Sequence, residues 1–143
     1  MGTARFCYGE REMTVGYLRT LFLHPPSSAG FDGGAGSRYQ AKREIRSFWY
    51  PTWLAQPAAL VPGSRLIDAP PDGLTLDDIR PLARQYELCV MHTSTPSFPG
   101  DIAVAEALKA ENPRLMIGMV GAAVAVAPEA SLAASGALDF VAG

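Results

Sequence analysis

The chain has 143 residues, of which 48% are hydrophobic and 18% charged, and its formal net charge is −2. This length and composition predict one globular domain with a real hydrophobic core and exclude an intrinsically disordered protein. The near-neutral charge gives no electrostatic basis for binding nucleic acid.

Residues 1–18 have no clear periodicity, and we expect them to form a poorly ordered leader before a folded domain of residues 19–143. They lack the apolar segment of a signal peptide. The longest apolar run, residues 115–127, contains two glycines and is shorter than the ~20 residues of a transmembrane helix. Cys7 and Cys89 are too few to form a disulfide framework, which favours a reducing, cytoplasmic location.

Five short apolar runs are predicted to be buried β-strands, because each is nearly continuous and is bounded by proline, glycine or polar residues. In chain order they are Arg19–Leu23, Arg65–Ala69, Leu88–Met91, Leu115–Val120 and Leu138–Val141. Helical patterns follow most of them. This alternation indicates a parallel α/β sheet that is covered on both faces, with the carboxyl ends of its strands at one edge.

The predicted helices span residues 51–60, 74–86, 99–111 and 129–135, and residues 121–128 are predicted to be a loop. Thr75 is a suitable N-cap for the second helix. The glycine-rich segment 27–47, with FDGGAGSRY at its centre, is long for a strand-to-helix connection. It is either a flexible loop or a place where the backbone approaches a ligand, and its spacing matches neither GxGxxG nor GxxxxGK[ST].

The stretch ELCVMHTSTPSFP, residues 87–99, places three hydroxyl side chains between a buried strand and a helix. Thr93, Ser94 and Thr95 could form a cradle for phosphate, ribose or amide groups at the carboxyl edge of the sheet. The later stretch GAAVAV, residues 121–126, consists of small residues. It either leaves room for a bulky flat ligand or simply packs closely.

His24 and His92 each lie at the end of a predicted strand. Two histidines without a carboxylate or cysteine at metal-binding spacing are weak support for a metal site, so we interpret both as polar strand-end residues. Asp68 also ends a strand, where it could bind a ligand hydroxyl, although capping of the following turn is favoured. No catalytic Ser-His-Asp arrangement or GxSxG motif is present.

Several segments together resemble a known family. They are LFLHPP, YPTWLAQPAAL, RLIDAPP, ELCVMHTSTPSFPGDIAVAEALKAENP, MIGMVGAAVAVAPE and LDFVAG. Residues 19–143 resemble the N-terminal cobalamin (B12)-binding domain of B12-binding radical SAM proteins. The stretch FDGGAGSRYQAKREIRSFWYPTWLAQP is similar to the subgroup associated with hopanoid biosynthesis, whose members are assigned to modification of the hopanoid side chain.

The sequence departs from the family pattern at several positions. His24 replaces the asparagine of the family's NPP motif, and the family's GG pair is Gly121-Ala122 here. The glutamate that follows the glycine of a Gly-Glu motif is absent after Gly143. The CxxxCxxC motif that binds a [4Fe–4S] cluster is also absent, so we do not expect this chain to cleave S-adenosylmethionine or to be catalytic alone.

The resemblance implies a flavodoxin-like (Rossmann-like) three-layer sandwich with a five-stranded parallel sheet in the order 2-1-3-4-5. Cobalamin would lie across the strand ends, with its nucleotide tail inserted beside the sheet. The residues that the resemblance assigns to cobalamin are His24, Pro25, Thr93, Ser94, Thr95, Gly121, Ala122, Ala123 and Gly143. The family usually lacks an axial histidine, so neither histidine is expected to bind cobalt.

The sequence therefore predicts the cobalamin-binding module of a B12-dependent radical SAM enzyme of hopanoid side-chain biosynthesis, truncated before the radical SAM domain. Such a domain would be a partner in cis or in trans. The alternative is a non-catalytic α/β interaction module, or a degenerate fragment that no longer binds a cofactor.

Overall fold

The structure is a computed structural model that describes residues 3–8, 11–26 and 51–143, with side chains described for residues 17–26 and 51–143. The glycine-rich segment 27–47, for which the sequence left two interpretations open, lies outside the described residues.

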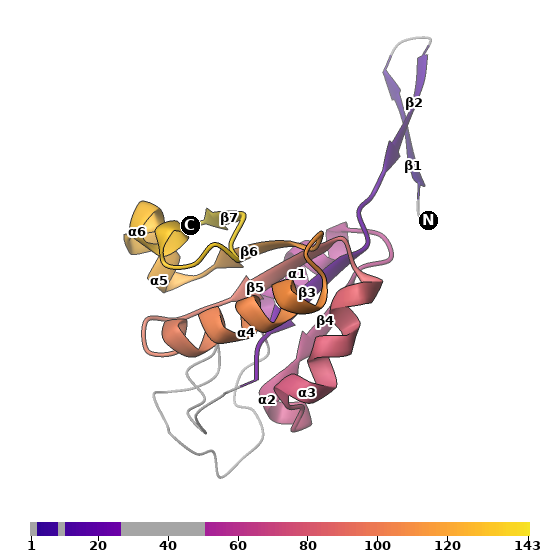
Figure 1. The fold of residues 1–143 in the computed structure, drawn as a ribbon. Coiled ribbons are helices and arrows are strands. Elements are labelled where there is room, and N and C mark those ends of the chain that lie inside the picture. Colours follow the sequence, from indigo (N-terminus) through magenta and orange to yellow (C-terminus); the bar gives the residue numbers. More distant parts are fainter. Residues whose placement is uncertain (1–2, 9–10, 27–50) are drawn as a thin grey trace.

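A five-stranded parallel sheet forms the centre of the molecule (Figure 1). Its strands are β3 (Thr20–His24), β4 (Arg65–Asp68), β5 (Leu88–His92), β6 (Met116–Val120) and β7 (Phe140–Ala142). They are arranged in the order β4-β3-β5-β6-β7. Numbered along the chain, this order is 2-1-3-4-5, so the predicted flavodoxin-like α/β sheet is confirmed.

The strand register divides the side chains of the sheet between two faces. Phe22 lies beside Val90, Val90 beside Gly118, and Gly118 beside Phe140. Because alternate residues of a strand point to opposite sides, these four share one face and their sequence neighbours share the other.

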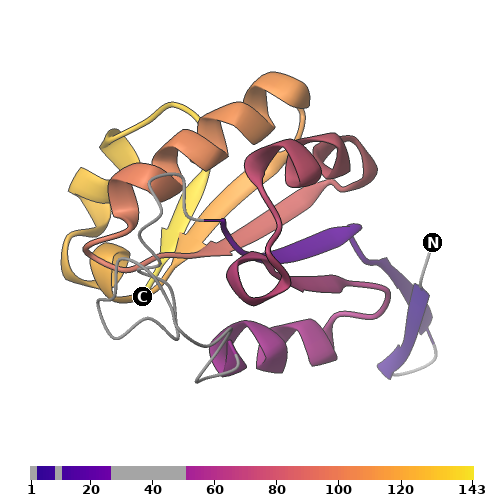
Figure 2. The same ribbon diagram turned by 90° about the horizontal axis from the view of Figure 1, so that it is seen from below.

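The face opposite Phe22 is covered by three helical segments, α3 (Leu76–Ile79), η1 (Arg80–Gln85) and α4 (Phe98–Glu111) (Figure 2). It contains the main hydrophobic core. The core side chains of the three central strands are Leu21, Leu23, Cys89, Met91, Ile117 and Met119, none of which is more than 1% exposed. Burial raises the pKa of the Cys89 thiol to about 12, so this side chain is a core residue in its protonated, unreactive form.

Helix α1 (Thr52–Leu60) lies on the other face of the sheet, with Leu54 as its fully buried contact (Figure 2). Coverage is less complete here. Val90 and Val120 are only half-buried, and Met116 and Phe140 are 39% and 36% exposed. A parallel sheet normally buries both faces, so it is unusual that apolar side chains on this face stay partly exposed.

β1 (Thr3–Tyr8) and β2 (Arg11–Gly16) form an antiparallel pair in the part of the chain where the sequence predicted a poorly ordered leader. The pair is separate from the five-stranded sheet (Figure 1). β1 contains Thr3, Phe6 and Tyr8, and β2 contains Thr14 and Val15, all residue types that favour strands, but neither has the long apolar run on which the prediction of strands relied.

Other boundaries also differ from the prediction. The predicted helix 74–86 begins at Leu76, after the N-cap Thr75, whose side chain and backbone form a capping box with Asp78. Its α-helical part ends at Ile79, and residues Arg80–Gln85 continue as a 3₁₀-helix. Pro81 explains the change, since proline disrupts α-helical hydrogen bonding. Residues Ala69–Asp72 form an additional short helix, α2. The predicted loop 121–128 instead contains α5 (Ala122–Val126), and α6 spans Pro128–Ala133.

None of the helices in the described part of the chain combines the length and the apolar character that crossing a bilayer requires.

Candidate functional site

Four neighbouring strands bring a row of side chains together at their carboxyl ends. Asp68 of β4 lies beside His24 of β3, and His92 of β5 lies beside Val120 of β6. Between β3 and β5 the pairing ends with Leu23 beside Met91, and His24 and His92 are the next residues on the two strands. The register therefore gathers an acid and two imidazoles that are far apart in the sequence.

His24 is held by Asp68. The Nδ1 atom of His24 is 2.5 Å from the Oδ1 atom of Asp68, and the histidine side chain is almost fully buried. A carboxylate only accepts hydrogen bonds, so Nδ1 is the donor and the ring orientation is fixed. The sequence favoured a capping role for Asp68. Asp68 does occupy the N-cap position of α2, but its side chain makes no capping hydrogen bond there.

His92 packs between two rings. Its ring centroid is 5.6 Å from that of Trp53 in α1, at an interplanar angle of 33°, and 6.0 Å from that of His24, in an edge-to-face arrangement. Burial and the nearby His24 lower the pKa of His92 to about 4. His92 is therefore a neutral imidazole at pH 7, with one nitrogen that donates and one that accepts hydrogen bonds.

Two buried nitrogens at this edge have no hydrogen-bond partner among the described residues, Nε2 of His24 and Nδ1 of His92. Buried polar atoms are usually paired, so such atoms need a reason. They do not complete a metal site from the described residues, in which no group of three or more His, Cys, Asp or Glu side chains is placed to hold an ion.

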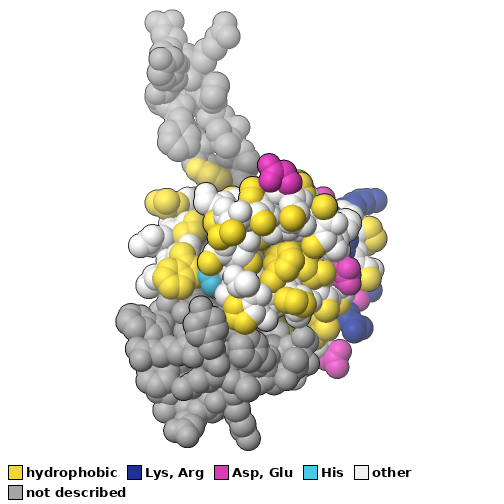
Figure 3. Space-filling model, turned by 90° about the vertical axis from the view of Figure 1, so that its left-hand side faces the viewer, with side chains coloured by type: hydrophobic (Ala, Val, Ile, Leu, Met, Phe, Trp, Pro, Cys, Tyr) yellow, Lys and Arg dark blue, Asp and Glu magenta, His cyan; other side chains and the backbone are white. Residues whose placement is uncertain are grey.

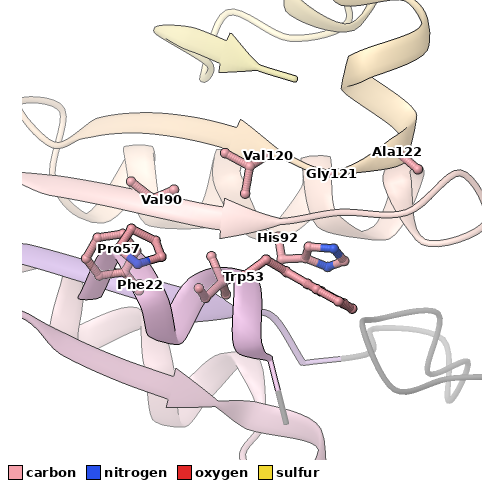
Figure 4. Close-up of a pocket in the computed structure, with 9 residues that line it drawn as sticks. Phe22, Trp53, Pro57, Val90, His92, Val120, Gly121 and Ala122 are labelled. Carbon is pink, nitrogen blue, oxygen red and sulfur yellow. The ribbon is translucent and has the colours of Figure 1, made fainter. Parts of the chain in front are cut away.

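A cavity of about 490 Å³ lies between α1 and the strand face that carries Phe22 (Figure 4). This volume is within the range of roughly 300–1,000 Å³ that is typical of small-molecule sites. We call it the slot. The described residues that line the slot are Phe22, Trp53, Leu54, Pro57, Val90, His92, Val120, Gly121 and Ala122.

The slot has an apolar interior and a more polar end. In Figure 4, Phe22, Pro57 and Val90 lie toward one end, whereas His92 and Trp53 extend to the end where the strands finish. Figure 3 views the molecule from the side on which these strands end. Hydrophobic side chains dominate the described surface there, a histidine is visible among them, and charged side chains lie toward the rim.

Gly121 lines one side of the slot, at a position that strongly favours glycine. Its φ of +127° is a conformation that side-chain-bearing residues rarely adopt. A Cβ atom there would lie 2.1 Å from the carbonyl oxygen of Thr93 and 3.2 Å from Nε2 of His92. The missing side chain thus lets the loop after β6 approach the end of β5.

Thr93 lies outside the slot lining and is fully buried. Its hydroxyl donates a hydrogen bond of 2.8 Å to Oδ2 of Asp101, which also accepts a 2.7 Å bond from the Ser97 hydroxyl. Burial raises the pKa of Asp101 to about 6, while the bonds from Ser97 and Thr93 and the proximity of His24 oppose this rise. The hydroxyl that the resemblance assigned to a cobalamin tail therefore fixes the start of α4 in this structure.

The other predicted site residues are distributed along the same edge. Pro25 is buried after β3, Ser94 is half-buried and Thr95 is exposed. The Ser94 hydroxyl lies 2.9 Å from that of Ser97. Gly121 and Ala122 line the slot, Ala123 follows them in α5, and Gly143 packs against Ala125 instead.

Sequence reasoning did not find most of the slot. It did not pair His24 with Asp68, and it interpreted His92 as a strand-end residue outside the site. The other lining residues that it missed are Phe22, Trp53, Leu54, Pro57, Val90 and Val120. One pattern in the sequence could have pointed to the slot. The even-numbered residues of β3, β5 and β6 share one face of the sheet, and a single helix is too narrow to cover several strands completely.

Comparison of the chain with family models, with curated proteins and with solved structures finds no match.

Proposed function

We propose that this chain is the cobalamin-binding module of a B12-dependent radical SAM enzyme of hopanoid side-chain biosynthesis. The observation that carries the proposal is the slot between α1 and the sheet. The sequence resemblance expects a nucleotide tail to insert beside the sheet, and the slot is an apolar cavity at that place that reaches the carboxyl ends of β5 and β6 (Figure 4).

The slot residues fit such a tail in chemistry as well as in size. The described lining consists of aromatic, aliphatic and glycine residues apart from His92, which suits a flat heteroaromatic ring. Phe22, Val90 and Val120 would contact the ring from the sheet, and Trp53 from the helix. When bound, cobalamin supplies the organometallic and radical chemistry, and the protein supplies binding and orientation.

The proposal concerns binding and not catalysis, because the chain contains only two cysteines and no CxxxCxxC motif. A radical SAM domain in cis or in trans is the proposed partner. The assignment to hopanoid metabolism comes from a stretch that lies largely outside the described residues. A reducing, cytoplasmic location is part of the same proposal and agrees with the buried free thiol of Cys89.

The test is retention of corrin by the purified full chain. After incubation with hydroxocobalamin and desalting, we expect visible corrin absorbance at about one equivalent per chain. Cobinamide, which lacks the nucleotide tail, should be retained poorly. A folded chain that retains no corrin would overturn the proposal.

A matched pair of variants tests the slot itself. Val120→Phe fills the slot from the sheet and should abolish retention of cobalamin. Gln56→Phe adds the same ring to an exposed position of α1 outside the lining and should leave retention unchanged. Equal retention by both variants would place the cobalamin elsewhere.

A second candidate is an α/β interaction module without a cofactor. The partly exposed Met116 and Phe140, on the incompletely covered sheet face, favour it. Size-exclusion chromatography with light scattering distinguishes this reading: concentration-dependent self-association without corrin binding would support it, and a monomer that retains corrin would not.

A further inference from the structure

The sheet face that carries α1 leaves apolar side chains of β6 and β7 partly uncovered. Helix α1 packs against β3 and β4 and makes no comparable contact with β6 or β7. A Cβ atom on Gly118 would lie 2.1 Å from the Phe140 ring, so this ring lies across the neighbouring strand, and Phe140 is still 36% exposed. We call this surface the open face. Its residues are Met116, Gly118, Phe140 and Ala142.

The antiparallel pair of β1 and β2, which we call the arm, is a second surface that the described chain leaves without a partner. Its two strands pack extensively only on each other, and they project away from the five-stranded sheet (Figure 1). A two-stranded pair is marginally stable in water unless another layer packs against it. The arm therefore needs a covering surface that its own chain does not supply in this arrangement.

The register of the arm separates its apolar positions from its polar ones. Phe6 pairs with Met13, and Ala4 pairs with Val15. Because alternate positions of a strand share a face, one face of the arm is apolar apart from one arginine. The positions on this face are Ala4, Phe6, Tyr8, Arg11, Met13 and Val15. Those on the other face are Thr3, Arg5, Cys7, Glu12, Thr14 and Gly16.

The root of the arm is fixed where β3 begins. The main-chain N–H of Arg19 donates a 2.9 Å hydrogen bond to Oε2 of Glu87, and the Arg19 carbonyl accepts a 2.8 Å bond from the N–H of Glu87. Only residues 17–19 separate β2 from β3. With its root held in this way, the arm lies clear of the open face of its own chain and is presented to another molecule (Figure 1).

Charge favours the open face of a second copy as the surface that covers the arm. Residues 115–143 include two acids, Glu129 and Asp139, and no lysine or arginine. The apolar face of the arm has one cation, Arg11, and no acid, so the two surfaces match in polarity and in the sign of their charge. A nucleic acid or an anionic membrane would require basic residues, which this C-terminal segment lacks.

We propose that two copies of this chain form a two-fold dimer in which the arm of each copy lies, by its apolar face, on the open face of the other. The exchange is reciprocal, so a single kind of contact occurs twice and the assembly closes at two chains. The open face shares no residue with the lining of the slot. The dimer therefore does not depend on the proposed function, and a ligand in the slot would not compete with the arm.

The first test is the mass of the full chain in solution, measured by size-exclusion chromatography with light scattering. We expect twice the chain mass of 15.2 kDa. Phe6→Asp in the arm and Phe140→Asp on the open face should each raise the dissociation constant of the dimer by at least about 30-fold, as expected for a central aromatic residue. A monomeric wild-type chain, or a dimer that Phe6→Asp leaves unchanged, would overturn the inference.

Two matched controls place the same charge outside the proposed contact. Thr14→Asp lies on the polar face of the arm, and Ala103→Asp lies at an exposed position of α4. Both variants should remain dimers with dissociation constants within about threefold of wild type. Circular dichroism of all four variants checks that they are folded. Equal weakening by Thr14→Asp and Phe6→Asp would contradict the assignment of the two arm faces.

Photocrosslinking covers the case in which Phe140→Asp does not fold. Chains with p-benzoylphenylalanine in place of Phe6 are mixed with ¹⁵N-labelled wild-type chains, irradiated and digested with trypsin. No lysine or arginine follows Arg114, so the open face lies within one tryptic peptide, residues 115–143. The expected product joins unlabelled residues 6–11 to this labelled peptide. Crosslinks confined to one chain, or to other peptides, would overturn the exchange of arms.

The outcomes also separate this inference from the proposed function. A monomeric chain that retains cobalamin would overturn the dimer and leave the cobalamin-binding function standing. A dimer that depends on the arm but retains no corrin would overturn the function and leave the dimer standing.

Discussion

The two faces of the sheet are built from the same strands but have different roles. On the face under α3, η1 and α4, side chains such as Met91 and Ile117 are completely buried. On the face under α1, Val90 and Val120 are half-buried and border the slot. Because side chains alternate along each strand, one face forms the closely packed core and the other borders a cavity. Substitutions one residue apart should therefore change the free energy of unfolding by very different amounts.

The largest expected difference is between Ile117 and Met116, which are adjacent in β6. Ile117→Ala should lower the free energy of unfolding by about 2–5 kcal/mol, because it leaves a cavity in the core. Met116, which is 39% exposed, should cost less than about 1 kcal/mol when replaced by alanine. Urea denaturation followed by circular dichroism measures both values, and equal losses would contradict the division of the sheet into two unequal faces.

Gly121 should give the next largest effect, because both its backbone conformation and its close approach to Thr93 disfavour a side chain. Gly121→Ala should cost about 1–3 kcal/mol through backbone strain, in addition to the clash with Thr93. Gly136 has no such φ and no atom within 4 Å of an added Cβ, so Gly136→Ala is the control and should be close to neutral. Thermal unfolding of the two variants provides the comparison, and an unaffected Gly121→Ala protein would show that this close approach is not required.

A smaller effect distinguishes the faces by pH, since each has one buried group whose shifted pKa lies between about 4 and 6. Asp101, on the α4 side, has a pKa of about 6 in the folded chain against 3.8 ordinarily, so its contribution to stability is lost as pH rises from about 4 to 6. His92, on the slot side, has a folded pKa of about 4 against 6.5, so its contribution grows as pH rises over nearly the same range.

The two contributions oppose each other, so single variants should reveal them. Relative to wild type, Asp101→Asn should gain stability as pH rises from 4 to 6, and His92→Phe should lose it, each by at most about 1.4 kcal/mol per pH unit. Denaturation midpoints between pH 4 and 7, taken as differences from wild type, measure these slopes. Parallel curves for all three proteins would contradict the shifted pKa values.

The fold could be predicted from the sequence because its signals are local. Buried parallel strands appear as short apolar runs such as Leu88–Met91, and helix starts appear as caps such as Thr75. The antiparallel pair of β1 and β2 was missed because antiparallel pairing outside the core does not require such runs. The short helix α5 was missed because GAAVAV combines a glycine, small residues and β-branched valines, which together give no clear preference.

The site was less predictable, because its geometry depends on register. The hydrogen bond between His24 and Asp68 joins residues 44 apart in sequence, and a shift of one residue in either strand would separate them. The histidines were correctly located at strand ends, but nothing in the sequence aligned them with each other or with Trp53. Whether the predicted residues contact cobalamin remains a prediction.

Cys89, at the centre of the covered face, can report on how often the central strand of this protein opens. A thiol that is fully buried and has a pKa of about 12 cannot react with alkylating reagents until the sheet opens around it. In a Cys7→Ser background, the rate of Cys89 labelling would therefore time the opening of the central strand. Any ligand that binds only the closed sheet should slow that rate in proportion to its occupancy.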